Sequence, residues 1–188
     1  MQQTTGNIRR YFYTVERHHL EKRCFRTSCK CQDYPPEGTP PIWAAAVRED
    51  WDTFQRCLDE DPLLLFSVTG SVHIYIHDKL DIAPSFYKDL PLIHLVATWS
   101  DNERGLRYLV SRAKELQGVV SLKDYINPDY RNGTPLHFAV QWSPNICAIK
   151  YLIAEGADIH ARNRDGKTPL DYAHTEEAKQ FLRERMAM

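Results

Sequence analysis

The residues best suited to metal chemistry lie near the start of the chain. They are His18, His19, Cys24, Cys29 and Cys31. Thiolate and imidazole are the ligands that zinc prefers, but structural zinc sites usually carry two closely spaced ligand pairs that are well separated from each other. The cysteines of this segment have no distant partner pair. The spacing therefore favours free cysteines, with a zinc site and a disulfide as the two alternatives.

Patterns typical of catalytic sites are missing from the sequence. It has no glycine-rich phosphate loop, no serine flanked by glycines at a nucleophile elbow, and no histidine pair at helical metal spacing. Cys57 and Cys147 could serve as nucleophiles, but both occupy apolar positions of expected helices. Because buried structural cysteines are inert, we expect no catalytic residue, no metal and no cofactor.

Two histidines belong to an internal repeat. The set His94, Trp99, Ser100, Asn102, Tyr108 and Leu109 recurs 43 positions later as His137, Trp142, Ser143, Asn145, Tyr151 and Leu152. A second offset, of 34 positions, relates Thr134, Pro135, Leu136 and Ala139 to Thr168, Pro169, Leu170 and Ala173. One offset kept over so many positions indicates copies of one structural unit, and helical repeats of about 33 residues are known.

The copy that contains His137 carries a specific motif. Residues 134–139 read Thr-Pro-Leu-His-Phe-Ala, residues 156–159 read Gly-Ala-Asp-Ile, and Gly166 to Leu170 opens the next copy. This pattern resembles the ankyrin-repeat family. In such a repeat the threonine caps the first helix, the proline fits its first turn, and a glycine such as Gly156 ends the second helix. The resemblance implies that His94 and His137 make structural hydrogen bonds between helix and loop.

The resemblance also implies the fold class. It is all-α, an ankyrin-repeat solenoid of about four helix pairs, with an N-terminal helical cap and one long hairpin-like connection between repeats. The expected repeats cover about residues 39–66, 89–117, 129–161 and 162–188 of a repeat domain that spans residues 39–188. Residues 67–88 form the extended connection, because Val72, Ile74 and Ile76 alternate with His73, Tyr75 and His77 at the period of a strand.

Residues 1–38 do not follow the repeat pattern. The apolar residues of this segment recur at roughly helical spacing: Ile8, Tyr11, Phe12, Val15, Leu20 and Phe25. They predict an amphipathic helix, which a proline-rich linker separates from the repeats. We expect this helix to cover the first repeat, because the end of a solenoid exposes an apolar face unless something caps it.

Charge and length limit the classes of partner. The 188-residue chain has a formal net charge of −1, and its apolar stretches are far shorter than the roughly 20 residues that cross a bilayer. Neither nucleic acid nor a membrane is implied. Five cysteines, an odd number, and no apolar secretory segment indicate a cytoplasmic protein, in the host cytosol if it is a pathogen effector. We expect it to be monomeric on its own.

Two local features have more than one interpretation. The acidic residues of the first repeat, Glu49, Asp50, Asp52, Asp59, Glu60 and Asp61, fit a solvated helix face, with docking of a basic partner as the alternative. Asn132-Gly133-Thr134 has the form of a glycosylation acceptor, but it lies where the ankyrin turn needs left-handed geometry, so we interpret it as a turn.

The resemblance implies a binding surface at two kinds of position, the loop tips before each threonine-proline turn and the residues just after the alanine of each first helix. Carried onto this chain, the partner-binding residues are Tyr87, Lys88, Thr98, Trp99, Tyr130, Arg131, Gln141, Trp142, Arg164, Asp165 and Lys167. Tyrosine, tryptophan and arginine are the side chains most enriched at interface hot spots. The recurring tryptophans have a structural alternative, in which they stack to hold adjacent repeats together.

The function that the resemblance implies is non-catalytic binding of another protein, as an inhibitor, an adaptor or an effector. Stacked helix pairs offer an extended surface and no deep pocket for a reaction. The alternative is an enzyme or metal-dependent module whose site lies in the N-terminal segment or in residues 67–88.

Overall fold

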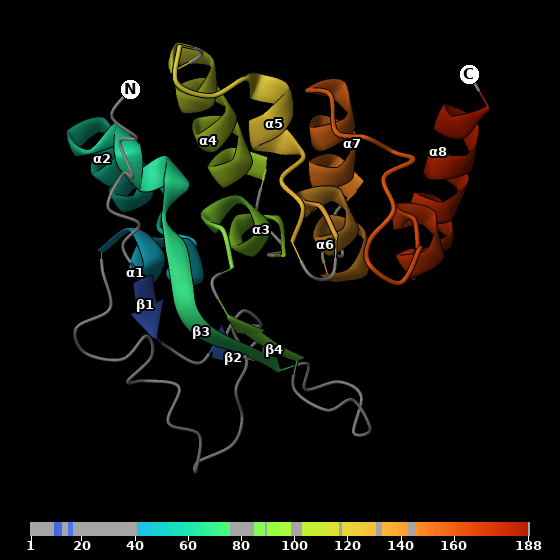
Figure 1. Cartoon of the computed structure of the whole chain (residues 1–188), viewed down its shortest axis with the longest axis horizontal. Helices are drawn as coiled ribbons and strands as arrows, with labels where there is room; N and C mark the ends of the chain where they lie inside the picture. The colour runs from blue at the N-terminus through green and yellow to red at the C-terminus, as the bar shows by residue number, and fades with distance from the viewer. Residues whose placement is uncertain are drawn as a thin grey trace, which may run out of the picture. The chain divides into compact units, whose positions relative to one another are not determined.

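The computed structural model describes residues 10–12, 15–16, 41–75, 85–88, 90–98, 103–116, 118–130, 133–142 and 146–187. Over these residues the chain is mostly helical (Figure 1). It divides into two compact units, Met1–Leu92 and Ile93–Met188. No helix in the described part is both long and apolar enough to cross a bilayer.

The first unit contains a helix pair, α1 (Pro41–Arg48) and α2 (Trp51–Glu60), whose members pack against each other. α1 ends at Glu49, whose left-handed φ of 56° is unusual for a residue with a side chain. This geometry lets the backbone N–H of Asp50 donate to the carbonyl oxygen of Ala45 at 2.9 Å. The carboxylate of Asp50 then accepts from the N–H of Thr53 at 3.1 Å, which caps α2.

Aromatic side chains fill the space between these two helices. Trp43 and Phe54 have no solvent-exposed surface, and the Trp51 and Phe54 rings meet edge to face at 5.5 Å. A short 3-10 helix, η3 (Pro62–Phe66), follows α2 and buries Leu65. A helix pair therefore lies where the sequence places the first repeat.

The rest of the first unit is a four-stranded sheet centred on β3 (Val68–Tyr75). β4 (Ser85–Lys88) pairs antiparallel with β3, in the register Ser71 to Lys88 through Ile74 to Ser85. This pair is the hairpin-like connection expected over residues 67–88. Two short segments, β1 (Arg10–Phe12) and β2 (Val15–Glu16), pair parallel with successive parts of β3.

The sheet corrects two expectations. The helix predicted from the spacing of residues 8–25 is wrong at residues 10–12 and 15–16, which are strands, and the remaining residues of that segment lie outside the described part. Tyr11, Phe12 and Val15 are residue types that favour strands, and a neighbouring strand with free backbone groups decides their conformation. The fold is therefore mostly helical with a small sheet, and not all-α.

The second unit consists of helices joined by short loops. α3 (Leu92–Ala97) begins at the boundary of the two units, and α4 (Glu103–Glu115), α5 (Leu122–Ile126), α6 (Pro135–Trp142), α7 (Ile146–Ala154), η4 (Pro169–Tyr172) and α8 (Glu176–Met186) follow. α7 packs against α4, α6 and α8, and α6 also contacts η4. Figure 1 shows α4, α7 and α8 side by side in chain order.

The short helix α5 is not among the elements expected from the sequence. Its start has a recognisable signal, because Ser121 and Asp124 stand three residues apart, as the two members of a helix-capping pair do. The Ser121 hydroxyl oxygen accepts from the N–H of Asp124 at 3.1 Å and donates to the Asp124 carboxylate at 2.6 Å. α5 packs on α4 and buries Tyr125 and Ile126.

The end of α5 fixes the loop that follows α7. The side-chain amide of Asn127 donates to the carbonyl oxygen of Gly156 at 3.0 Å, and its oxygen accepts from the N–H of Asp158 at 2.7 Å. Gly156 has a φ of 100°, which ends α7 as expected from the sequence. A single half-buried asparagine thus joins the end of α5 to two backbone groups about thirty residues away.

Candidate protein-interaction surface

Two loops of the second unit precede the threonine-proline turns, and each is held by a histidine. We name Tyr130–Gly133 finger 1 and Asn163–Lys167 finger 2. The Nε2 atom of His94, in α3, lies 3.1 Å from the carbonyl oxygen of Gly133. The Nε2 atom of His137, in α6, lies 3.0 Å from the carbonyl oxygen of Lys167. A carbonyl oxygen only accepts, so both histidines donate from Nε2.

The two described ends of finger 1, Tyr130 and Gly133, form an antiparallel pair. The backbone N–H of Gly133 donates to the carbonyl oxygen of Tyr130 at 2.7 Å, and the reverse bond is 3.2 Å long. Gly133 has a φ of 115°, and a Cβ atom there would lie 2.5 Å from the His137 ring. The turn therefore requires glycine both for its backbone and for the space that His137 occupies.

Aromatic rings surround finger 1. His94 contacts the rings of Tyr130 and Phe138, with centroids 5.6 Å and 5.0 Å away. The Tyr130 and Phe138 rings meet edge to face at 6.2 Å. These contacts place Tyr130 inside the unit, with 9% of its surface exposed.

His137 is fixed at both ring nitrogens. Its Nδ1 accepts the backbone N–H of Thr134 at 3.1 Å, and the Thr134 hydroxyl lies 3.0 Å from the same nitrogen. Nδ1 is therefore unprotonated, and the ring is neutral with its proton on Nε2. The threonine of the motif thus bonds to the histidine ring three residues later. Thr168 repeats the arrangement with a different partner, because its N–H and hydroxyl donate to the Asp171 carboxylate at 2.7 Å and 2.9 Å.

Burial keeps both histidines neutral. It lowers the pKa of His94 from its ordinary value of 6.5 to about 3, although the hydrogen bond to Gly133 acts in the opposite direction. Burial also lowers the pKa of His137, opposed by the bond to Lys167. Neither ring has any exposed surface. Their geometry is that of structural hydrogen bonds, as the sequence analysis expects for both.

Finger 2 is built around a buried side chain. The Asn163 side-chain oxygen accepts from the N–H of Asp165 at 3.0 Å and from the N–H of Lys167 at 2.9 Å. Its amide donates to the Tyr172 hydroxyl at 2.9 Å. The backbone N–H groups of Asn163 and Gly166 complete the loop by donating to the carbonyl oxygens of Lys167 and Asn163. These bonds fix the backbone of finger 2 independently of its other side chains.

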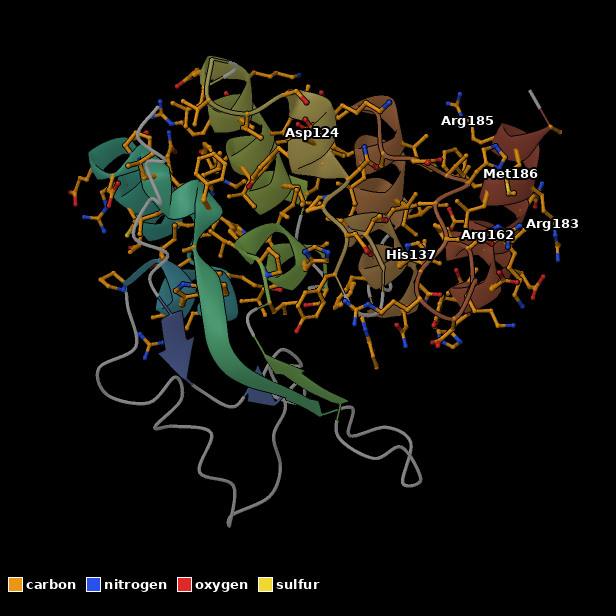
Figure 2. All side chains as sticks on the ribbon, in the orientation of Figure 1. Asp124, His137, Arg162, Arg183, Arg185 and Met186 are labelled. Atoms are coloured by element: carbon orange, nitrogen blue, oxygen red, sulfur yellow. The ribbon has the colours of Figure 1, made fainter. Side chains whose placement is uncertain are left out.

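The remaining side chains of finger 2 point into solvent. Arg164, Asp165 and Lys167 are all exposed. Arg162, directly before the finger, is also exposed, and its guanidinium donates to the carbonyl oxygen of Gly166 at 2.7 Å (Figure 2 labels Arg162 and His137). A rigid backbone that displays charged side chains is a suitable surface for another protein.

The other residues expected to contact a partner fall into three groups. Thr98, Tyr130 and Trp142 are buried, with exposed fractions of 1%, 9% and 5%. Gln141 is half-buried. Trp99 and Arg131 lie outside the described residues, as do the side chains of Tyr87 and Lys88, whose backbone belongs to β4.

Burial favours a structural role for the first group. The Thr98 hydroxyl donates to the carbonyl oxygen of Leu95 at 2.6 Å, and so closes the end of α3. The indole N–H of Trp142 is buried and has no hydrogen-bond partner among the described residues. Position in a repeat did not distinguish these residues from the exposed ones, because α6 is apolar over nearly its whole circumference.

The described residues contain no group of three or more histidine, cysteine, aspartate and glutamate side chains placed to hold a metal ion. The N-terminal histidines and cysteines lie outside these residues. Cys57 is half-buried, and burial raises the pKa of its thiol. Cys147 is exposed, which corrects the expectation that it is buried. α7 is apolar at most positions, so an apolar position there does not imply burial.

A second charged surface, on the outer helices, was not found from the sequence. The guanidinium of Arg107, in α4, lies 4.6 Å from the centre of the Tyr151 ring, in α7. Lys150, in α7, lies 5.6 Å from the Phe181 ring, in α8. Ion pairs accompany these contacts: Arg107 with Glu103 at 2.6 Å, Arg112 with Glu115, and Lys114 with Glu155 at 2.6 Å. Cations of this surface are thus engaged with neighbouring carboxylates and rings of the same unit.

The comparison with protein families finds one match in the second unit. Residues 122–173 match the family model described as ankyrin repeats (many copies). The matched segment contains α5, α6, α7 and η4, together with both fingers and His137. The search of curated proteins found no match.

Proposed function

We propose that this chain, an ankyrin-repeat protein by the match over residues 122–173, is a non-catalytic module that binds a partner protein. Ankyrin repeats are generally protein-interaction modules. The contact surface that we propose is centred on finger 2 and its exposed residues Arg164, Asp165 and Lys167. Gln141, Trp99, Arg131, Tyr87 and Lys88 remain proposed contributors, whereas Thr98, Tyr130 and Trp142 have structural roles.

The observation that carries this proposal is that the groups that hold finger 2 in place differ from the side chains that it exposes. Backbone groups, Asn163 and His137 make the bonds that hold the loop. The side chains of Arg164 and Lys167 form no hydrogen bond or ion pair within the described part of the chain. A prefolded loop with unused polar side chains loses little conformational entropy when a partner binds.

The biological role that follows is stoichiometric binding of a partner. An inhibitor, an adaptor and an effector would all use such a surface. We propose that the protein acts in the cytoplasm, or in a host cytosol, and that it is monomeric until it meets its partner.

The test is affinity capture with the full chain as bait, compared among three proteins. The native chain should recover one dominant partner in near-stoichiometric amount. The variant that combines Arg164→Ala, Asp165→Ala and Lys167→Ala should recover it poorly, because each binding hot spot contributes roughly 1 to 4 kcal/mol. None of the three substitutions removes a bond that holds the loop, so melting temperature should stay near the native value.

The matched control replaces exposed charges elsewhere in the second unit, Lys123→Ala in α5 with Glu177→Ala and Arg183→Ala in α8. Figure 2 shows Arg183 pointing away from the other helices of the unit. This control should capture the partner as the native chain does. Equal recovery by the finger variant and the native chain would exclude finger 2 as the contact surface.

A further inference from the structure

Basic residues of α4 and basic residues around finger 2 differ in their electrostatic surroundings. On α4, the guanidinium of Arg107 and the ammonium of Lys114 each lie 2.6 Å from a carboxylate oxygen of the same unit. Around finger 2, Arg162, Arg164 and Lys167 form no such ion pair within the described residues. The charges of Arg107 and Lys114 are neutralised locally, whereas those of the finger are not.

Asp171 and Asp165 are carboxylates of this region, and among the described residues neither forms an ion pair with these cations. Asp171 is engaged by Thr168, whose N–H and hydroxyl are the largest causes that lower its pKa, with smaller contributions from Lys167 and Arg162. Asp165 belongs to the finger itself. Residues 162–167 therefore carry three cations and one anion on a loop with a fixed backbone.

We propose that finger 2 recognises an acidic segment of the partner protein, one rich in aspartate or glutamate. This inference rests on the proposed function and specifies the chemistry of the partner. Arginine binds carboxylates through two parallel hydrogen bonds, and Arg164 has its whole guanidinium available. Lys167 adds a second cation whose backbone position His137 fixes. Asp165 would repel a partner carboxylate that lies opposite it. It therefore determines how the acidic segment aligns along finger 2.

Charge also distinguishes a protein partner from a nucleic acid. A nucleic acid is usually held through many phosphate contacts, which require an extended basic face. The whole chain has a formal net charge of −1, and the cations of α4 are already paired. A local cluster of three cations fits a short acidic segment and not a polyanion.

The test uses the full chain and three fluorescein-labelled probes in fluorescence anisotropy. The probes are a glutamate-rich peptide, a lysine-rich peptide of the same length, and single-stranded oligothymidylate. The native chain should bind the glutamate-rich peptide best, and added salt should weaken this binding. Charge reversal with Arg164→Glu and Lys167→Glu should raise its dissociation constant by a factor of roughly 5 to 30.

The matched control reverses two exposed cations that also form no ion pair with another described residue, Lys123→Glu and Arg183→Glu. It changes net charge by the same amount but leaves finger 2 intact, and it should change binding by less than about twofold. Circular dichroism shows whether each variant is folded. If the reversed finger unfolds, the neutral pair Arg164→Gln and Lys167→Gln replaces it, with a smaller loss of affinity expected.

Three results would overturn the inference: no binding of the glutamate-rich peptide, equal weakening by the finger variant and the control, or stronger binding of oligothymidylate or the lysine-rich peptide. Each is distinguishable from failure of the proposed function. If the partner is captured through finger 2 but acidic peptides do not bind, the binding module stands and the acidic specificity is wrong. If no partner is captured, the proposed function itself fails.

Discussion

Fingers 1 and 2 occupy equivalent places in successive repeats but are held in different ways. Finger 1 closes through two backbone bonds between Tyr130 and Gly133 and is packed among aromatic rings. Finger 2 closes around the Asn163 side chain and exposes its charges. In both, a histidine of an earlier helix, α3 or α6, donates to the last backbone carbonyl of the finger.

The difference shows which part of the repeat is structural and which part is free to vary. The histidine-to-carbonyl bond is common to both fingers, so it belongs to the framework. The bonds inside each finger differ, and so does the exposure of the side chains at positions 130 and 164. The exposed side chains of such a loop can therefore change without any loss of the histidine-to-carbonyl bond.

The largest effect that would separate the fingers is expected for Gly133→Ala. A φ of 115° strains any residue with a Cβ atom, and the new methyl group would overlap the His137 ring. Together, strain and overpacking should lower the free energy of unfolding by about 3 to 4 kcal/mol, measured by urea denaturation.

Gly166→Ala in finger 2 is the control, since its φ is 72° and nothing lies within 4 Å of the added atom. It should cost about 1 kcal/mol. Similar losses for both variants would contradict the role assigned to His137.

Acid should weaken finger 1 more than finger 2 through the histidines. The folded protein holds His94 with a pKa of about 3, whereas the unfolded chain binds that proton near pH 6.5. The stabilisation is therefore complete above pH 6.5 and is lost as the pH falls towards 3. Between pH 6.5 and 4.5, His94 alone should account for a loss of about 2 kcal/mol in unfolding free energy.

His94→Asn should make the pH dependence in this window clearly flatter, and His137→Asn should flatten it less, because His137 lies less deeply in the protein. The pH range ends at 4.5 so that carboxylates with lowered pKa values, such as Asp171, do not titrate within it. Urea denaturation at several pH values measures the slope of each variant. A steep slope that persists in His94→Asn would assign the pH dependence to other groups.

Removal of the Asn163 side chain tests the internal support of finger 2. Asn163→Ala leaves the N–H groups of Asp165 and Lys167 without their acceptor and should cost about 2 kcal/mol, or about 1 kcal/mol for each bond. Hydrogen exchange at these two amides should accelerate, while the amide of Gly133 in finger 1 should exchange as before. Acceleration in both fingers would mean that the two loops unfold together.

The smallest effect is expected for the exposed side chains of finger 2. Arg164→Ala and Lys167→Ala should each change the free energy of unfolding by less than about 0.5 kcal/mol, because neither makes a bond within the described chain. Thermal denaturation is sufficient to check this. A loss above about 1 kcal/mol for either variant would reveal a structural role and weaken its assignment to a binding surface.

The sequence predicted what depends on local spacing. The resemblance implied that His137 makes structural hydrogen bonds, and its ring bonds to Thr134 and to the carbonyl oxygen of Lys167. The sequence also predicted the left-handed glycine at Gly156 and the strand pair that begins at Val68. Such features follow from the conformations available to a few consecutive residues.

The errors concern features that distant parts of the chain decide. The strands at residues 10–12 and 15–16 form because β3 offers free backbone groups, so their helical spacing was misleading. The burial of Trp142 and the exposure of Cys147 depend on how α6 and α7 pack, since both helices are largely apolar. Tyr130 and Arg164 occupy the same position by the 34-residue offset, so position alone did not separate the buried side chain from the exposed one.

The two histidine bonds run in one direction along the chain. Each joins a helix to a loop that is synthesised later, with separations of 39 residues for His94 and 30 residues for His137. Contacts of this modest separation favour rapid folding, because only a short stretch of chain has to be closed for each bond. In a growing chain, finger 1 can be locked once residue 133 has emerged, well before finger 2 exists. The second unit is therefore suited to stepwise assembly, in which each completed helix provides the anchor for the next loop.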